Sequence, residues 1–294
     1  MANYLVKSII DDGNFRAYAV NATNVVAEAQ RRHDTWSASS AALGRTLTAT
    51  LLLSTSLMKG QESMTVKVQG DGPAKGIVVD ADANGHVKGY IVNPHVHLPL
   101  NDKGHIDVGA AVGKNGALSV TKNLGLDKPY TGQVALVSGE IGDDFTYYLA
   151  QSEQIPSAVG VSVFVENDNT IGVAGGFMIQ VLPGASDEAI SKLEESLKAL
   201  PQVSQLLREG KTPEDILNAL FGEERVKILE RVPVSFQCDC SKDKFAKDLA
   251  SLSDKDLKDM IAEDHGAEAV CRFCGNKYQF SEQDLQTILK EKNA

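Results

Sequence analysis

The 294-residue sequence has only four cysteines, one tryptophan and nine prolines, and it contains no long apolar run. The most apolar stretch, ALGRTLTATLLLSTSLM at 42–58, is interrupted by Arg45 and by several hydroxyl side chains, whereas a membrane span needs about 18 uninterrupted apolar residues. The N-terminal segment MANYLVKSIIDDG has too short an apolar run for a signal peptide. We therefore expect a cytoplasmic protein with no membrane partner.

Positive charge is also scarce, because 29 lysines and arginines face 39 aspartates and glutamates, which gives a formal net charge of −10. A dedicated nucleic-acid binder usually displays a basic field, so we expect no nucleic-acid partner. The length and the 43% hydrophobic content allow two domains with a sizeable core.

Common catalytic motifs are missing too. The sequence has no Walker motif with its terminal Lys-Ser/Thr, no G-x-S-x-G elbow and no H-E-x-x-H. Glu140, Asp143 and Asp144 fit an acidic helix N-terminus better than a catalytic carboxylate pair. His95 and His97 lie two residues apart, but no third metal ligand is evident near them. These absences predict a protein that is not an enzyme.

Charge is distributed unevenly along the chain. The first 180 residues carry 13 basic and 17 acidic side chains, and the last 114 carry 16 and 22. The first part is rich in Gly, Val and Ala, and the second in Lys, Glu, Asp and Leu. This change predicts a boundary near LPGAS at 182–186.

Residues 1–182 are predicted to form an α+β domain of mixed sheet and helix. YLVKSII and FRAYAV flank the turn sequence DDGN, which indicates a hairpin. Helices are expected at 23–33, at 37–59 with Ser37 near the N-cap, and at 143–154. Alternating patterns predict further strands in MTVKVQG, KGIVVDAD, HVKGYIV, ALSVTKNL, GQVALVSG, VGVSVFVE and GVAGGFMIQV.

Residues 183–231 are predicted to form a charged, helical linker. DEAISKLEESLKAL places its apolar side chains on one helical face. TPEDILNALF begins with Thr212 as N-cap, Pro213 at the first helical position and Asp215 three residues after the cap, the spacing of a capping box. Each helix is short and has a narrow apolar face, so it is marginal in isolation. We expect that face to lie against the first domain.

Residues 232–294 have few apolar side chains for a segment of about 60 residues. Capping boxes are expected at Ser253–Asp256 and at Ser281–Asp284, with Gly266 ending the first of the two helices. A segment of this size and composition usually needs a metal or a covalent cross-link to fold.

All four cysteines lie in this last segment, as Cys238-x-Cys240 and Cys271-x-x-Cys274, with thirty residues between the pairs. In a reducing cytosol, paired cysteines are more often metal ligands or redox groups than permanent disulfides. Zinc takes four such sulfurs in a tetrahedron, and Gly275 after the second pair is typical of a zinc knuckle. We therefore predict one zinc ion per chain and expect His265, the nearest competing ligand, to lie on the surface.

The chemistry of the cysteines permits two roles. A closed four-thiolate site is normally structural. A disulfide across the single residue between Cys238 and Cys240 would be strained and therefore labile, and thiolates are the form that oxidants attack. The residues alone leave both a structural zinc clip and a redox switch open.

The sequence as a whole resembles the heat-shock protein 33 family of bacterial redox-regulated molecular chaperones. The resemblance is carried by the C-x-C and C-x-x-C pairs together with QRRHDTWSASSAALGRT, GDGPAKGIVVDA, SGEIGDDFTYYLAQSEQIPSAVGV and AGGFMIQVLPGA. It runs essentially from end to end of the chain.

The resemblance implies a reduced, zinc-bound form that is inactive and an oxidised form that has lost zinc. In the oxidised form the disulfides would be Cys238–Cys240 and Cys271–Cys274, and the small C-terminal zinc-binding domain would unfold as a redox switch. That form would hold unfolding client proteins without ATP, as part of a stress response, and activation would be accompanied by homodimer formation.

Two other functions remain open on the sequence. A thiol–disulfide oxidoreductase could use Cys271 and Cys274, but it would need this pair at the start of a helix in a thioredoxin-like context. A nucleic-acid-binding zinc module would need a basic field, whereas 232–294 is acidic.

Overall fold

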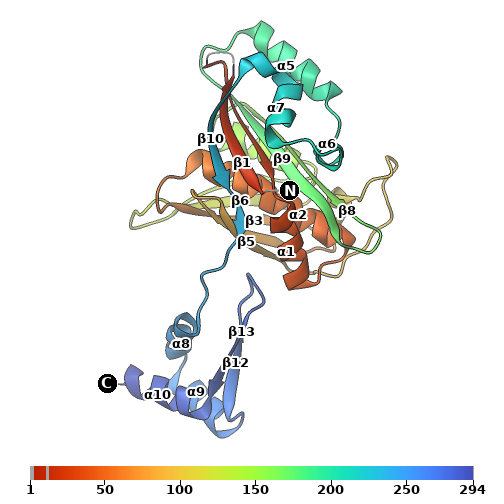
Figure 1. The fold of residues 1–294 in the computed structure, drawn as a ribbon. Helices are drawn as coiled ribbons and strands as arrows, with labels where there is room; N and C mark the ends of the chain where they lie inside the picture. The colour runs from red at the N-terminus through yellow and green to blue at the C-terminus, as the bar shows by residue number, and fades with distance from the viewer. Residues whose placement is uncertain (1–2, 11–12, 294) are drawn as a thin grey trace. The chain divides into compact units, whose positions relative to one another are not determined.

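The strands expected from alternating patterns are present, and they form two mainly antiparallel sheets in the computed structural model, which describes residues 3–10 and 13–293 (Figure 1). The five-stranded sheet has the order β10-β1-β2-β9-β8 and the six-stranded sheet the order β11-β5-β4-β3-β6-β7. The strands span β1 Tyr4–Ile10, β2 Phe15–Asn21, β3 Ser63–Gln69, β4 Ile77–Asp82, β5 His86–Ile91, β6 Ala117–Asn123, β7 Tyr130–Ala135, β8 Ser157–Val165, β9 Ile171–Val181, β10 Val226–Pro233 and β11 Ser235–Phe236. The expected first hairpin is formed by β1 and β2, and its predicted turn includes residues 11–12, which lie outside the described residues.

Helix α2 (Ser37–Leu57) packs against strands of both sheets. It is buried on nearly all sides, and its hydroxyl side chains donate to carbonyls one turn back, as from Thr46 to Ala42 and from Thr50 to Thr46. Because these bonds satisfy its buried hydroxyl groups, α2 can lie at the centre of the first domain. Helices α1 (Thr23–His33), α3 (Val108–Val112) and α4 (Gly142–Gln151) complete this layer. Ser37 is the first residue of α2, and the N-cap itself is Trp36.

The linker forms three helices, α5 (Asp187–Ala199), α6 (Val203–Arg208) and α7 (Pro213–Phe221), which lie together over the five-stranded sheet (Figure 1). Thr212 caps α7 through the expected capping box with Asp215. The apolar side chains of these helices share one cluster with residues of β1, β2 and β9, including Phe15, Phe177 and Ile179. The expected docking of the linker on the first domain is therefore present.

The linker is not helical throughout, which corrects the prediction for its last residues. Residues 226–233 form β10, which pairs antiparallel with β1, and β11 then pairs parallel with β5. VKILERV has apolar residues that fit either a helix or a strand, and the pairing partner lies more than 200 residues earlier in the sequence. Local periodicity could not reveal that partner, and tertiary pairing decides the conformation.

The chain divides into two compact units, Met1–Gln237 and Cys238–Ala294. The second unit contains α8 (Lys242–Ala250), α9 (Asp254–Ala262), α10 (Glu282–Lys292) and a hairpin of β12 (Gly266–Val270) and β13 (Lys277–Ser281). Ser253 and Ser281 cap α9 and α10 as expected, with a reciprocal capping box at Ser281. The expectation that Gly266 ends α9 is wrong, because α9 ends at Ala262 and Gly266 is the first residue of β12. The fold class is α+β with the four cysteines gathered in the C-terminal unit, as predicted from the sequence. Across the described residues, every helix is too short or too polar to cross a membrane.

Candidate metal centre and the surface beneath the linker

The four cysteines come together within the second unit. Their sulfur atoms all lie within 4.8 Å of one another, with Cys238 Sγ 3.7 Å from Cys271 Sγ and Cys240 Sγ 3.3 Å from Cys274 Sγ. All four are thiols in this structure. Among residues 3–10 and 13–293, this is the one group of His, Cys, Asp or Glu side chains compact enough to hold a metal ion.

The hairpin of β12 and β13 positions the second cysteine pair. Cys271 follows β12, and its N–H donates to the carbonyl of Asn276 at 2.9 Å, while the N–H of Gly275 donates to the carbonyl of Cys271 at 2.8 Å. Gly275 has φ +73°, a conformation that glycine adopts without strain. This tight turn holds Cys271 and Cys274 on one side of the hairpin, which is the knuckle that the sequence predicts.

The first pair lies just before α8, whose N-cap is Ser241. Tyr278 of β13 connects the two pairs, because its hydroxyl donates to the carbonyl of Cys240 at 2.9 Å and lies 3.2 Å from Cys240 Sγ. The Tyr278 ring also packs on Phe245 of α8, with ring centroids 5.2 Å apart. The sequence analysis missed Tyr278, and its place four residues after Cys274 on an alternating strand was the available signal.

Burial and mutual contact set the acidity of the thiols. Cys271 and Cys274 are buried and the other two are half-buried. Burial raises the pKa of Cys238 to about 11 and also raises the pKa of Cys274. Burial acts in the same direction on Cys240, but hydrogen bonds from Tyr278 and from the neighbouring thiols outweigh it and lower its pKa to about 7.

The donor set fits a soft metal ion. Four sulfurs at these separations, with no carboxylate or imidazole among them, match the ligands of a closed structural zinc site. His265 does not join them; it is exposed, and its Nδ1 lies 3.7 Å from a carboxylate oxygen of Glu282. The cluster can therefore hold a metal ion through Cys238, Cys240, Cys271 and Cys274.

The other candidate residues have separate partners in the first unit. His95 stacks on Trp36, and His97 Nδ1 lies 2.7 Å from the hydroxyl of Ser37. Asp144 accepts hydrogen bonds from the N–H groups of four residues that precede α4 or begin its first turn, Val137, Ser138, Gly139 and Ile141. Asp144 thus stabilises the start of α4, as its acidic sequence predicts.

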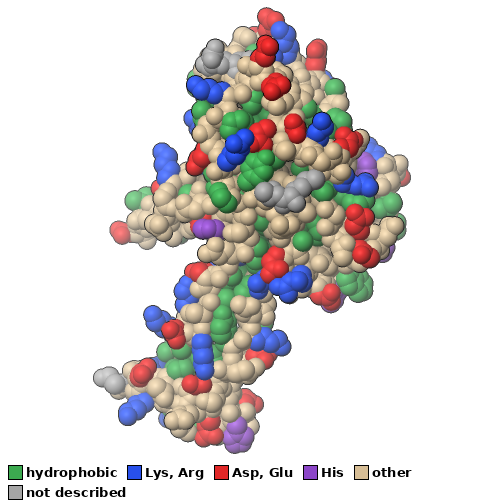
Figure 2. Space-filling view, viewed as in Figure 1, with side chains coloured by type: hydrophobic (Ala, Val, Ile, Leu, Met, Phe, Trp, Pro, Cys, Tyr) green, Lys and Arg blue, Asp and Glu red, His purple; other side chains and the backbone are tan. Residues whose placement is uncertain are grey.

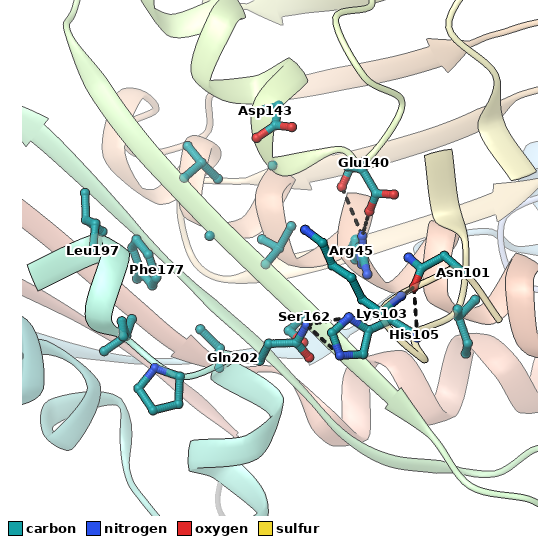
Figure 3. Close-up of a pocket in the computed structure, with 18 of the residues that line it drawn as sticks. Arg45, Asn101, Lys103, His105, Glu140, Asp143, Ser162, Phe177, Leu197 and Gln202 are labelled. Carbon is teal, nitrogen blue, oxygen red and sulfur yellow. Dashed lines mark hydrogen bonds and ion pairs between the residues drawn. The ribbon is translucent and has the colours of Figure 1, made fainter. Parts of the chain in front are cut away.

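A cavity of about 730 Å³ lies between the linker and the first domain (Figure 3). Phe177 and residues 159–162 line it from the sheet, and residues 197 and 200–203 line it from the linker. Figure 3 shows Arg45 facing Glu140, whose carboxylate lies 2.5 Å from the guanidinium, and Gln202 facing His105 at 3.1 Å. The cavity is large enough to hold water and has charged side chains in its lining, so the linker and the sheet are not in close contact at this point.

Elsewhere α6 fits the sheet more closely. A Cβ on Gly175 would lie 2.6 Å from a methyl group of Leu207, so this glycine leaves the space that Leu207 occupies. Arg208 lies over the ring of Phe164, 3.9 Å from its centroid. Ser162 donates to Ser204 Oγ at 2.7 Å inside the interface. Three side chains of α6, Ser204, Leu207 and Arg208, therefore contact the sheet directly.

Comparison with known proteins agrees with the resemblance seen in the sequence. A protein-family model described as Hsp33 protein matches residues 3–281. A 33 kDa chaperonin of Levilactobacillus brevis is 67% identical over 294 residues, which cover all of both chains. A 33 kDa chaperonin of Lactiplantibacillus plantarum is 66% identical over 289 residues, or 98% of each chain.

A solved structure has the same fold. The crystal structure of the 33 kDa chaperonin from Thermotoga maritima matches with a TM-score of 0.93 and 37% sequence identity. The match covers 100% of this chain and 99% of that one, so it includes both compact units.

Proposed function

Because this chain belongs to the Hsp33 family, we propose that it is a redox-regulated molecular chaperone that holds unfolding proteins without using ATP. The observation that carries the redox part is a cluster of four thiols in a unit that has little else to hold it together. We assign residues 1–182 to the chaperone core, 183–231 to the linker and 232–294 to the switch. Residues 232–237 of this switch pack with the first unit.

In the reduced protein, Cys238, Cys240, Cys271 and Cys274 would hold one zinc ion per chain. Zinc bound in this way supplies a structural link between two distant segments, with an apparent free energy of about 10–16 kcal/mol in small peptides. The stabilisation that the second unit gains from its own apolar core is small by comparison with this zinc-binding free energy. Its buried apolar side chains in the described region are Leu257, Phe280, Leu285 and Ile288.

Oxidation converts the four ligands into two disulfides. In each, two thiolates lose two electrons to one molecule of hydrogen peroxide and the S–S bond forms, while the peroxide O–O bond breaks and its two oxygen atoms take up two protons from solvent and leave as two water molecules. Disulfide sulfurs are poor metal ligands, so the second unit then depends on its small core alone and unfolds. Because all four sulfurs lie within 4.8 Å of one another, their distances do not select the disulfide partners. We take the pairs Cys238–Cys240 and Cys271–Cys274 from the family pattern, and mass spectrometry of oxidised peptides tests them.

The linker is the next part to respond. Its helices have charged outer faces, and their stability comes from the cluster that they share with β1, β2 and β9. When the linker leaves, Phe15, Phe177 and Ile179 become exposed on the sheet. An apolar face of this kind binds the apolar segments that an unfolding protein exposes, and a second copy of the chain can dimerise through it.

Two structural observations separate this function from its alternatives. Cys271 and Cys274 lie in a turn between two strands, whereas an oxidoreductase pair of this type begins a helix. Charges of both signs are interspersed on the face shown in Figure 2, so that face has no basic field of the kind that nucleic acid would favour, and the net charge of the chain is −10. We place the protein in the cytoplasm, where its thiols are reduced in the absence of stress.

The direct test measures zinc content and suppression of aggregation side by side, on reduced and on peroxide-treated protein. We expect one zinc ion per chain and no suppression in the reduced sample. The oxidised sample should have lost zinc and should suppress the aggregation of a heat-denatured client without ATP. Suppression that is equal in both samples would contradict the redox-regulated function.

A further inference from the structure

Strand β10 covers one edge of the five-stranded sheet. It pairs with β1 from Tyr4 opposite Pro233 to Ile10 opposite Val226, with a register shift between Lys7 and Ser8. β2 pairs with the other side of β1, so removal of β10 would leave β1 as an unpaired edge strand. An open edge strand presents a row of unpaired N–H and C=O groups and is a template for another extended chain.

The side chains of β10 contribute little to holding it in place. Most of them are exposed, Leu229 among them at 57%, and Val232 is the one that is buried. Lys7 makes a 3.0 Å ion pair with Glu230 at the sheet surface. The edge of β1 thus holds an extended segment mainly through the backbone, with few demands on its sequence.

The remaining contacts of β10 depend on the linker helices. Val226 and Ile228 pack against the cluster that the linker shares with the sheet. Glu214 of α7 accepts a hydrogen bond from the Tyr4 hydroxyl at 2.6 Å and another from Arg231 Nε at 2.7 Å. Glu214 therefore connects α7, β1 and β10, and departure of α7 removes this link and the part of the apolar contacts of β10 that the linker supplies.

We propose that β10 is an exchangeable strand, and that the edge of β1 beneath it binds an extended segment of an unfolded client protein. This inference rests on the proposed function, because it requires release of the linker. The client segment would bind as β10 does, by antiparallel pairing to β1. The apolar face that α7 vacates lies on the same sheet, so it favours a client segment in which apolar and polar residues alternate.

Hydrogen exchange tests the exchange of strands directly. We compare reduced protein, oxidised protein, and oxidised protein with reduced, carboxymethylated α-lactalbumin as a permanently unfolded client. Among residues 4–10, the amides that face β10 should lose protection on oxidation and regain it when the client is added, whereas those that face β2 should stay protected. Amides of β9 are the internal control, because this strand keeps both of its neighbours and should stay protected in all three samples.

A peptide provides a second test that needs no variant of the protein. A synthetic peptide with the sequence of residues 224–236 should compete for the β1 edge and raise the apparent Kd of the client about tenfold at a peptide concentration about nine times the peptide's own Kd. The matched control carries Ile228→Pro and Glu230→Pro, which prevent a paired strand, and should leave the Kd unchanged. Equal effects of the two peptides would overturn the proposal.

The outcomes also separate this inference from the function on which it rests. If oxidised protein does not suppress aggregation, the proposed function fails. The chaperone function stands and the exchange of strands is wrong in either of two cases, both with aggregation suppressed. In the first, the β10-facing amides of residues 4–10 stay protected in all three samples; in the second, they stay unprotected when the client is bound.

Discussion

The two compact units bury apolar side chains to very different extents. In the first unit, one continuous cluster surrounds α2 and includes fully buried side chains such as Phe145, Tyr148, Leu47, Leu51 and Leu52. Among the described residues of the second unit, four apolar side chains of the main cluster are buried, and eleven more are partly buried against them. The first unit is thus stabilised by burial, whereas the second has a much smaller core. In the proposed mechanism the link between the cysteines makes up for this smaller core, so that oxidation would unfold the second unit while the first stays intact.

The largest expected effect comes from removing half of the sulfur ligands, with Cys271→Ser and Cys274→Ser in one variant. Serine is a poor zinc ligand, so zinc affinity should collapse and 238–294 should be largely unfolded even under reducing conditions. We expect partial chaperone activity without oxidant, because unfolding releases the linker. Zinc analysis and light scattering on reduced protein measure both results. A variant that loses zinc and yet stays as inactive as the reduced parent would contradict a switch that works by unfolding.

We expect an effect of intermediate size from a matched pair of leucine substitutions, one in each unit. Leu47→Ala in α2 and Leu285→Ala in α10 each remove a fully buried side chain, at a cost of about 2–5 kcal/mol. In the first unit this cost should lower the thermal midpoint and leave zinc affinity unchanged. In the second unit, folding is coupled to zinc binding, so about 3 kcal/mol should weaken zinc affinity about 100-fold. Competition with a chromophoric chelator measures the affinity, and a Leu285→Ala variant that binds zinc like the parent would show that the second unit folds by burial after all.

We expect a smaller effect, on the free energy of linker opening, from substitution of Glu214, which joins the linker to β1 and β10. Partial burial acts to raise the pKa of Glu214, but hydrogen bonds from Tyr4 and Arg231 outweigh it and lower the pKa below its ordinary value of 4.5. A lowered pKa means that the stabilisation is fully present above about pH 4.5 and is lost as the pH falls through the folded value.

We therefore expect Glu214→Gln to open the linker more readily than the parent at pH 7, by about 1 kcal/mol, and the difference to shrink as the pH falls below 4.5. Amide exchange of 213–221 at several pH values measures it. The control is Glu188→Gln, whose carboxylate pairs with Lys192 on the exposed face of α5 and should have little effect. A difference for Glu214→Gln that does not depend on pH would contradict a role for its charge.

Local patterns were sufficient for much of this structure. The cysteine spacing led to the four-sulfur cluster, the capping boxes at Thr212 and Ser281 marked helix starts, and alternation located β3 to β6, β8 and β9. Each of these signals lies within a few residues of the feature that it predicts, apart from the meeting of the two cysteine pairs.

The misses have a common physical cause. β10 needs β1 as a partner far away in sequence, and the hydrogen bonds of Tyr278 to Cys240 and of Tyr4 to Glu214 join side chains that only the fold brings together. No periodicity within 226–233 distinguishes an edge strand from the end of a helix. The pairing of the cysteines in disulfides is likewise not determined by spacing, because all four sulfurs are neighbours.

The most direct test of the contrast between the two units is hydrogen exchange along the whole chain, on reduced and on peroxide-treated protein. We predict that residues 238–294 lose protection on oxidation, that the linker helices at 187–221 follow, and that α2 and β9 stay protected. Equal protection of 187–221 in both states, in a sample that has lost its zinc, would contradict the account, because unfolding of the small unit would then not release the linker.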